Sequence, residues 1–278
     1  MKMKQKNTSS IIAIILVTIT LVMVIAPFIW LIYSSLKTNK EFMASVWKLP
    51  AAPQWENFKK AWGGGSLGTY TINSLIVTAV SVFLTVIIST LAGYAMWIFK
   101  LKKWMNKIQL FLVITMTIPA YASLVPLVET LRAMSLLDTL TGVILPTVAF
   151  NTPMSIFIMR STFFTLPFEV IEAARFDGAS EPVIFTKIAV PLVRPAMFTT
   201  AIINMIWVWN DFLFPLVFIN NPNLKTLPVG LKDFVGEHVT NYPVMMAAIL
   251  IASMGAFVIY SIFQKQVIGG LTGGAVKG

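Results

Sequence analysis

Six long apolar stretches run through the sequence, and shorter segments with charges, prolines and glycines separate them. The stretches are residues 11–36, 71–99, 108–128, 139–159, 196–219 and 242–263. A helix needs about 20 mainly apolar residues to cross the hydrocarbon core of a bilayer. Because lipid offers no hydrogen-bond partners to open backbone groups, we expect each stretch to be a helix. The pattern predicts an all-α integral membrane protein with six transmembrane helices.

Prolines lie inside or beside several of these stretches, namely Pro27, Pro119, Pro126, Pro146 and Pro215. A proline removes one backbone hydrogen bond and bends a helix, and in a membrane the neighbouring helices satisfy the freed groups. We therefore expect kinked spans.

The composition is that of a chain solvated mainly by lipid. Of the 278 residues, 57% are hydrophobic and 12% are charged, and the mean hydropathy is +0.80. A soluble domain would carry about 25% charged residues. The chain has no cysteine, which excludes disulfides, zinc thiolates and thiol catalysis. The single histidine, His238, leaves little room for a histidine-rich metal site.

The basic residues indicate the orientation in the membrane. The apolar run over residues 11–36 is longer than the core of a signal peptide, so we expect a retained span. Six spans place both termini on one side, and most of the 21 lysines and arginines fall in segments on that side. Cytoplasmic loops carry an excess of such residues. We therefore expect both termini, and the segment 160–195, in the cytoplasm.

The polar segment between the fourth and fifth stretches reads EAARFDGASEPVIFTKIAVPLVRP and begins at Glu172. We expect a first helix that ends at about Phe176, followed by Gly178 as a left-handed stop. Ser180 is a suitable N-cap for a second helix, which is expected to end before Pro191. The segment is predicted to form two short helices joined by a corner.

Each short helix has a small apolar face, with Phe168, Ile171 and Ala174 on the first and Phe185 and Ile188 on the second. A helical corner with an apolar knob on a cytoplasmic surface is suited to fill a groove in another protein. The same spacing also fits a hairpin that lies on the membrane surface without a partner. Spacing alone leaves both interpretations open.

This run resembles the EAA loop in the permeases of binding-protein-dependent ABC importers. That loop reads EAA, three residues, glycine, nine residues, isoleucine, one variable residue, leucine and proline. In this sequence Val190 replaces the leucine, which keeps an apolar side chain. The resemblance implies a coupling helix that docks in a cleft of an ATPase subunit. The matching residues, to which this role would carry over, are Glu172, Ala173, Ala174, Asp177, Gly178, Ala179, Ile188 and Pro191.

Two further stretches are similar to carbohydrate importers of the maltose-permease type. They are WVWNDFLFPLVF, residues 207–218, and TLPVGL, residues 226–231. The C-terminus, GLTGGAVKG, is similar to the tail of the smaller maltose permease subunit. In that relative the tail reaches into the ATPase dimer interface. The resemblance therefore implies an ATPase contact by Gly274, Val276, Lys277 and Gly278.

Asn210 and Asp211 lie within the fifth apolar stretch. An intramembrane carboxylate faces a wet cavity or a partner, because its charge is costly in lipid. We take both residues as candidates for the lining of a translocation cavity. The alternative is a pair that packs against a partner subunit, because in maltose-type importers the sugar site lies mainly in the other permease.

The resemblance implies the type I architecture of ABC importer permeases and a division into three parts. Residues 1–70 would hold the N-terminal tail, the first span and an external loop. Residues 71–263 would form a five-helix core that includes the coupling loop 160–195, and residues 264–278 a cytoplasmic tail. The chain would lie in a prokaryotic plasma membrane and import a sugar or oligosaccharide.

Partners are implied as well. No GxxxxGK[ST] motif is present, so this chain cannot cradle a nucleotide in the P-loop manner. The resemblance implies a transporter subunit with no cofactor of its own, and ATP and magnesium would be used by two copies of a partner ATPase. A second permease and an external solute-binding protein complete the implied complex, and the outer segment 220–241 is its expected contact with the binding protein.

Other functions fit less well. The same permease type also serves polyols and glycerol phosphates, although no arginine lies inside the apolar stretches. An ion-coupled secondary transporter would need an internal ion site, for which Asp211 is the clear carboxylate. A membrane protease would need Ser66 of a GxSxG run held against His238, and no scaffold for that pair is visible.

Overall fold

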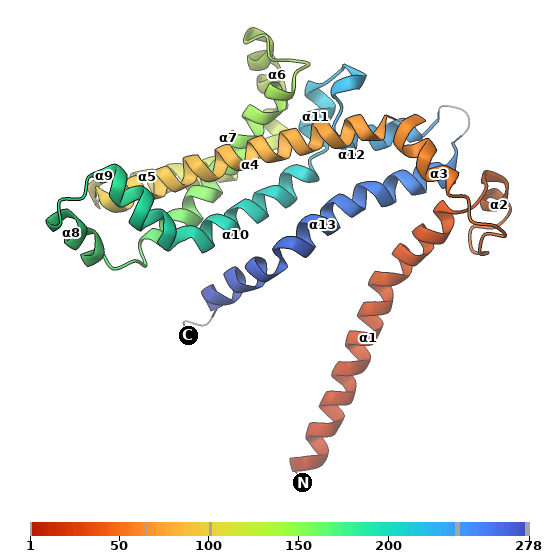
Figure 1. Ribbon diagram of the computed structural model, residues 1–278, viewed down its shortest axis with the longest axis horizontal. Helices are drawn as coiled ribbons and strands as arrows, with labels where there is room; N and C mark the ends of the chain where they lie inside the picture. Colours follow the sequence, from red (N-terminus) through yellow and green to blue (C-terminus); the bar gives the residue numbers. More distant parts are fainter. Residues whose placement is uncertain (1, 65, 100–101, 237–239, 276–278) are drawn as a thin grey trace. The chain divides into compact units, whose positions relative to one another are not determined.

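The computed structural model describes residues 2–64, 66–99, 102–236 and 240–275 (Figure 1). This described part is built from helices, turns and loops, and it contains no strand. The chain divides into two compact units. Unit 1 comprises Met1–Gly68 with Gly230–Met254, and unit 2 comprises Thr69–Val229 with Gly255–Gly278. The two units are described separately.

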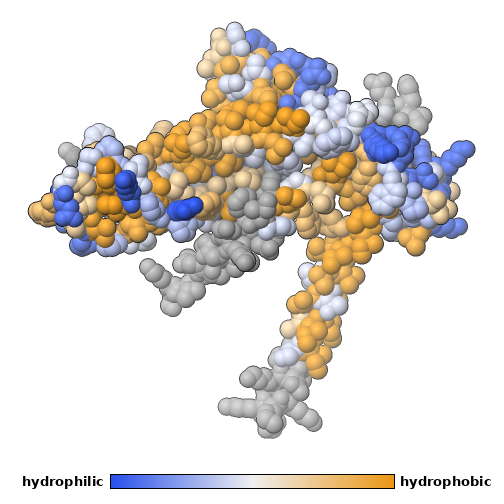
Figure 2. Space-filling model, viewed as in Figure 1, coloured by the Kyte–Doolittle hydropathy of each residue, from blue (hydrophilic) through white to orange (hydrophobic). Residues whose placement is uncertain are grey.

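Unit 1 contains one long helix, several short turns and the beginning of another long helix. Its elements are α1 (Lys2–Ser35), α2 (Asn39–Ala44), α3 (Glu56–Lys59), the π-helical turn η1 (Lys60–Gly64), the 3₁₀ turn η5 (Leu231–Phe234) and the first part of α13 (Tyr242–Ala275). Over residues 11–29, the side chains of α1 are mostly hydrophobic and exposed (Figure 2). A helix with no polar face is suited to a lipid environment.

A buried lysine organises the loop that follows α1. The Lys37 side chain is only 1% exposed, and its Nζ donates to the backbone oxygens of Ser45 (3.2 Å) and Val46 (2.9 Å). The Asn57 amide donates to the Lys37 carbonyl at 2.8 Å. Burial of an ammonium is tolerable only when hydrogen bonds replace its water. These contacts therefore hold the loop in one conformation, and desolvation lowers the pKa of Lys37.

Unit 2 contains the remaining elements in chain order. They are α4 (Leu67–Ile98, whose first residues belong to unit 1), α5 (Lys102–Thr117), η2 (Ala120–Ser123), α6 (Leu124–Ala133), α7 (Leu140–Phe163), α8 (Glu169–Phe176), α9 (Glu181–Val183), η3 (Ile184–Ala189), α10 (Val190–Trp209), α11 (Leu213–Phe218), η4 (Pro222–Leu224) and α12 (Leu227–Gly230). Helices α8 and α9 lie together at one end of unit 2, beside the end of α4 (Figure 1).

Small and polar side chains let the helices of unit 2 approach closely. A Cβ added to Gly93 of α4 would lie 3.0 Å from the backbone nitrogen of Arg160 in α7. Between α10 and α7, the buried Asn204 amide donates to the Ser155 hydroxyl at 2.9 Å. Helices in membranes associate through such small residues and interhelical hydrogen bonds, because lipid removes the hydrophobic drive between them.

The prediction of an all-helical membrane protein is confirmed, but the count of six spans is not. Four described helices are long and apolar enough to cross a membrane, namely Ser10–Ser35, Leu67–Ile98, Leu140–Phe163 and Glu181–Trp209. The predicted third span is bent by 82° between Lys107–Thr117 and Ala120–Ala133. The described apolar part of the sixth, Tyr242–Gly255, is shorter than a full span.

One of the expected kinks, at Pro119, is a complete break, and a second break lies at residues 210–212, where no kink was expected. Pro119 follows the last turn of α5, and the residue before a proline is pushed out of helical geometry, so the chain turns sharply there. The fifth predicted span also divides, because α10 ends at Trp209 and α11 begins at Leu213. Each break leaves backbone groups that no regular helix satisfies.

The expected end of the second coupling helix before Pro191 is wrong. Residues 181–209 are helical throughout, from α9 through the π-helical η3 into α10, and Pro191 lies in the first turn of α10. A proline ring normally clashes with the carbonyl of the preceding turn. The wider π-helical turn before Pro191 gives the ring room, and the helix continues.

Candidate functional site: a helical corner and a cavity at two helix breaks

The corner after α8 is a complete Schellman motif. Gly178 has φ +79°, the left-handed conformation that glycine adopts without strain. The Ala179 N–H donates to the Ala174 carbonyl, and the Gly178 N–H donates to the Arg175 carbonyl, both at 3.0 Å. These are the two bonds that define the motif. The sequence pattern Ala-x-x-x-Gly-Ala therefore encodes the shape of the corner directly.

The residues of the corner separate into an inner and an outer face. Ile171 and Ile184 are fully buried, Ala174 is 8% exposed, and all three belong to a core with Trp97 and Phe163. The apolar residues expected to form a knob therefore pack inward on the chain itself.

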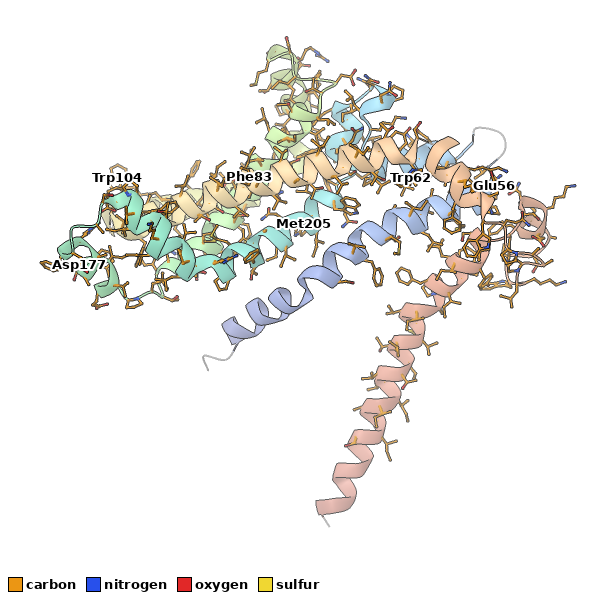
Figure 3. All side chains as sticks on the ribbon, in the orientation of Figure 1. Glu56, Trp62, Phe83, Trp104, Asp177 and Met205 are labelled. Carbon is orange, nitrogen blue, oxygen red and sulfur yellow. The ribbon has the colours of Figure 1, made fainter. Side chains whose placement is uncertain are left out.

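The outer face consists of exposed side chains on one side of α8 and at its end. Glu172, Ala173 and Asp177 are exposed, and Asp177 lies at the loop between α8 and α9 (Figure 3). Phe176, which the sequence reasoning did not select, is 91% exposed. The spacing in the sequence could have predicted this exposure, because Phe176 follows Glu172 by one helical turn and therefore lies on the polar side of α8. This aromatic ring is the apolar anchor of the outer face.

The other predicted coupling residues have different positions. Ala179 is half-buried at the corner, and Ile188 is half-buried in η3, packed against the inner core. Pro191 is exposed on α10, beyond the corner. The structure therefore brings the first six motif residues together, and it places the last two along the helix that leaves the corner.

Most residues of the predicted C-terminal ATPase contact lie outside the part of the chain that the structure describes. Gly274 lies in α13, whereas Val276, Lys277 and Gly278 lie outside the described residues. His238, the candidate partner of Ser66, also lies outside them. The predicted ATPase contact of the C-terminal residues therefore stays a prediction, and the pairing of Ser66 with His238 stays untested. In the described part of the chain, no group of three histidine, aspartate or glutamate side chains could hold a metal ion.

A cavity of about 970 Å³ lies where the two spans are broken. It is lined by Ala120, Tyr121, Leu124, Thr147, Phe150, Asn151, Ile206, Trp207, Val208, Asn210, Asp211, Phe212, Leu213 and Phe214. These residues come from η2, α6, α7, the end of α10, the second break and α11. Irregular backbone at membrane depth is tolerated where it lines a cavity, and broken helices mark the binding sites of many transporters.

The two predicted cavity residues also cap the helices at the break. The Asn210 amide donates to the Ile206 carbonyl at 2.8 Å, in the last turn of α10. Asp211 Oδ1 accepts from the Leu213 N–H at 3.1 Å, at the start of α11. Both residues also line the cavity described above.

The chemistry of the cavity suits a polar ligand with apolar faces. Tyr121 and Trp207 expose 73% and 70% of their area, so their rings are available for stacking. Asn151, Asn210 and Asp211 supply amide and carboxylate groups for hydrogen bonds. A few placed polar groups among aromatic side chains is the usual composition of a small-molecule site.

Comparisons with known proteins agree with this geometry. Residues 85–271 match the family described as binding-protein-dependent transport system inner membrane component. The chain is 35% identical to the sulfoquinovosyl glycerol transport system permease protein SmoH of Agrobacterium fabrum, covering 94% of this chain and 92% of that protein. It is 36% identical to the melibiose/raffinose/stachyose import permease protein MelC of Bacillus subtilis, covering 91% of each.

A solved structure shares the fold. In the crystal structure of a bacterial ABC transporter involved in the import of the acidic polysaccharide alginate, one chain superposes with a TM-score of 0.82. The match covers 94% of this chain and 97% of that chain, at 22% sequence identity. The two chains therefore share their overall fold.

Proposed function

Because the chain belongs to the family of binding-protein-dependent transport system inner membrane components, we propose that it is the permease subunit of an ATP-driven sugar importer. One observation carries the proposal. A single helical run, residues 181–209, begins at the exposed corner and ends at Trp207 and Val208 in the wall of the cavity. A movement applied to the corner is therefore transmitted to the cavity by a continuous helix.

The corner is the contact with the ATPase. Its outer face offers Phe176 as an apolar anchor among exposed polar residues, and the Schellman motif fixes its shape before docking. A pre-organised element loses little conformational freedom on binding. Closure of the ATPase pair would move the corner and switch the cavity between the two sides of the membrane, while this chain performs no covalent chemistry.

The substrate class is a sugar or oligosaccharide. Two relatives named above are permeases for glycosides and oligosaccharides, and the cavity combines aromatic rings with amide and carboxylate groups. Sugars present apolar C–H faces and many hydroxyls, which match these two kinds of group. A polyol or glycerol phosphate is the alternative solute for the same site.

The remaining features belong to the same proposal. Both termini lie in the cytoplasm, a second permease chain faces the cavity, and two ATPase copies that use ATP and magnesium dock from the cytoplasmic side. An external binding protein docks on the opposite side, with the segment 220–241 in its reach. The chain then has three parts, which are an anchor (residues 1–70), a permease core (71–263) and a tail (264–278).

The proposal is tested by purification from native membranes followed by uptake measurements. We expect the wild-type chain to co-purify with an ATPase and a second permease in fixed ratio. In proteoliposomes that contain the complex and its binding protein, radiolabelled melibiose or raffinose should enter only with ATP. Uptake driven by an ion gradient without ATP would instead support a secondary transporter. Uptake of glycerol 3-phosphate and neither sugar would support the alternative solute.

Replacing Phe176 by alanine is expected to weaken ATPase docking. Burying a phenylalanine side chain contributes about 1.5–3 kcal/mol, so affinity should fall about 10- to 100-fold. The measurement is titration of the purified ATPase onto the permease in nanodiscs. Phe83→Ala is the matched control, because Phe83 is 63% exposed but lies in the middle of the span α4 (Figure 3). Equal affinity of both variants and wild type would contradict a docking role for Phe176.

Asp211 variants test the cavity. Asp211→Asn keeps an oxygen that can accept from Leu213 N–H, whereas Asp211→Ala removes both the charge and the helix cap. If the carboxylate binds the solute, we expect about tenfold lower uptake for both variants, because one charged hydrogen bond contributes about 1.5–3 kcal/mol. If Asp211 only caps α11, only the alanine variant should lose uptake. Normal uptake by Asp211→Ala at normal expression would contradict both roles.

A further inference from the structure

A carboxylate at the corner joins three separate elements of unit 2. Glu181, in the first turn of α9, accepts on Oε1 from Arg175 Nε at 2.9 Å and Nη2 at 2.6 Å, across the corner from α8. Its other oxygen, Oε2, accepts from the Tyr94 hydroxyl of α4 at 3.1 Å. The helices before and after Gly178 are thereby tied to each other and to the span α4.

Aromatic rings surround the Tyr94 end of this contact. The Tyr94 ring packs against Phe185 of η3 and Phe163 of α7, with centroid distances of 4.9 and 5.8 Å. Trp97, one turn further along α4, meets Phe168 before α8 edge-on at 5.6 Å. The end of α4 therefore contacts the segments on both sides of the corner.

The contact among Arg175, Glu181 and Tyr94 contributes little to the stability of the fold. The side chains of Arg175 and Glu181 are 40% and 53% exposed, and exposed ion pairs contribute little because water screens them. The contact instead fixes how α4 and the corner are aligned relative to each other. Apolar ring contacts can shift along one another, whereas a hydroxyl bonded to a carboxylate that is itself held by a guanidinium keeps one register.

The corner is connected to α10 through the backbone, but to α4 only through side-chain contacts. The corner continues through residues 181–209 into α10, so α10 moves with it by backbone alone. Helix α4 precedes the corner by more than seventy residues and is joined to it only by side chains. Motion can pass from the corner to α4 through the Tyr94–Glu181 contact and the rings beside it, and also through the apolar core that Trp97 shares with Ile171 and Ile184.

We infer that Tyr94 and Glu181 are positioning residues that make α4 move together with α10 when the ATPase displaces the corner. The inference rests on the proposed function. Without the hydrogen bond, the ATPase still docks on the outer face of α8, and α10 still moves. Helix α4 then lags behind, and the transport cycle loses efficiency without loss of assembly.

Distance measurements between the two helices test the inference directly. The chain has no cysteine, so Phe83→Cys on α4 and Phe198→Cys on α10 give a unique pair of spin labels. The full complex in nanodiscs is measured without nucleotide and with ATP–vanadate. In the native background the interspin distance should stay constant. With Tyr94→Phe or Glu181→Ala added, it should change by about 2 Å or more, the size of typical helix shifts.

A functional readout accompanies the distances. For each variant, sugar uptake per ATP hydrolysed should fall about 2- to 30-fold, the range over which single residues change coupling between sites. The amount of co-purified ATPase should stay at the wild-type level. Tyr242→Phe is the control for loss of a tyrosine hydroxyl, since the Tyr242 ring stacks on Phe42 in unit 1, and it should behave as wild type.

The outcomes separate the inference from the proposed function. Wild-type uptake efficiency and a constant distance in Tyr94→Phe would overturn the inference, as would a distance that already changes in the native background. Loss of the ATPase from the variant complexes would also overturn it, because the contact would then serve docking. If wild type itself recovers no ATPase, the proposed function fails.

Discussion

Replacement of Gly178 by proline should abolish recovery of the ATPase with this chain and reduce ATP-dependent uptake to background. Proline holds φ near −65°, whereas Gly178 has φ +79°. Proline also removes the N–H that donates to the Arg175 carbonyl at 3.0 Å. Loss of both should cost about 3 kcal/mol or more, which weakens docking at least about 100-fold. Co-purification and uptake measure the two effects.

Gly178→Ala provides the graded control. An added Cβ at this position has no neighbour within 4 Å, so alanine is disfavoured only by the left-handed backbone. That conformation costs an L-residue about 1–2 kcal/mol. We expect partial loss of ATPase recovery, between wild type and Gly178→Pro. Full recovery with Gly178→Pro, at normal expression, would show that the corner does not need this geometry for docking.

Gly142→Ala should destabilise unit 2 more than any other single methyl group added at a described glycine. A Cβ at Gly142 would overlap the Leu136 carbonyl oxygen. That oxygen is held in place, because it accepts from the Thr139 hydroxyl at 2.7 Å. The clash is with backbone, so the turn before α7 must move. Overpacking of this kind costs about 1–3 kcal/mol.

The measurement is thermal unfolding of the purified chain in detergent, followed by size-exclusion chromatography. We expect the midpoint to fall by about 5 °C, since 1 kcal/mol shifts a domain of this size by about 2–4 °C. Gly63→Ala is the matched control, because its Cβ would have no neighbour within 4 Å, and the shift should be near zero. Equal midpoints for the two variants would contradict the close approach at Gly142.

Local chemistry accounts for the features that were predicted correctly. The spans follow from the length of each apolar run, because lipid forces any such run to become a helix. The corner follows from Ala174, Gly178 and Ala179, because a Schellman motif is completed within six residues. The end of α8 at Phe176 follows from the same motif. None of these features needs information from elsewhere in the chain.

The features that only the structure reveals depend on contacts between distant segments. Nothing local shows that Ile171 and Ile184 face inward, because residues of α4, α7 and α10 supply much of the core that covers them. The same packing leaves Phe176 on the outside, although its side chain is as apolar as those that are buried. An apolar face in a short helix predicts a contact, but the rest of the fold decides whether the chain itself or a partner provides it.

The effects of glycine and proline on the helices also separate into those set by neighbouring residues in the sequence and those set by packing. Apolar length and the glycine corner settle the fold class and the position of the coupling segment from residues that are neighbours in sequence. Packing settles that Pro191 lies inside a continuous helix, that residues 118–119 form a sharp break, and that this break meets Asn210 and Asp211 around one cavity. A proline removes one hydrogen bond in every case, and whether the helix continues depends on the distant groups that surround it.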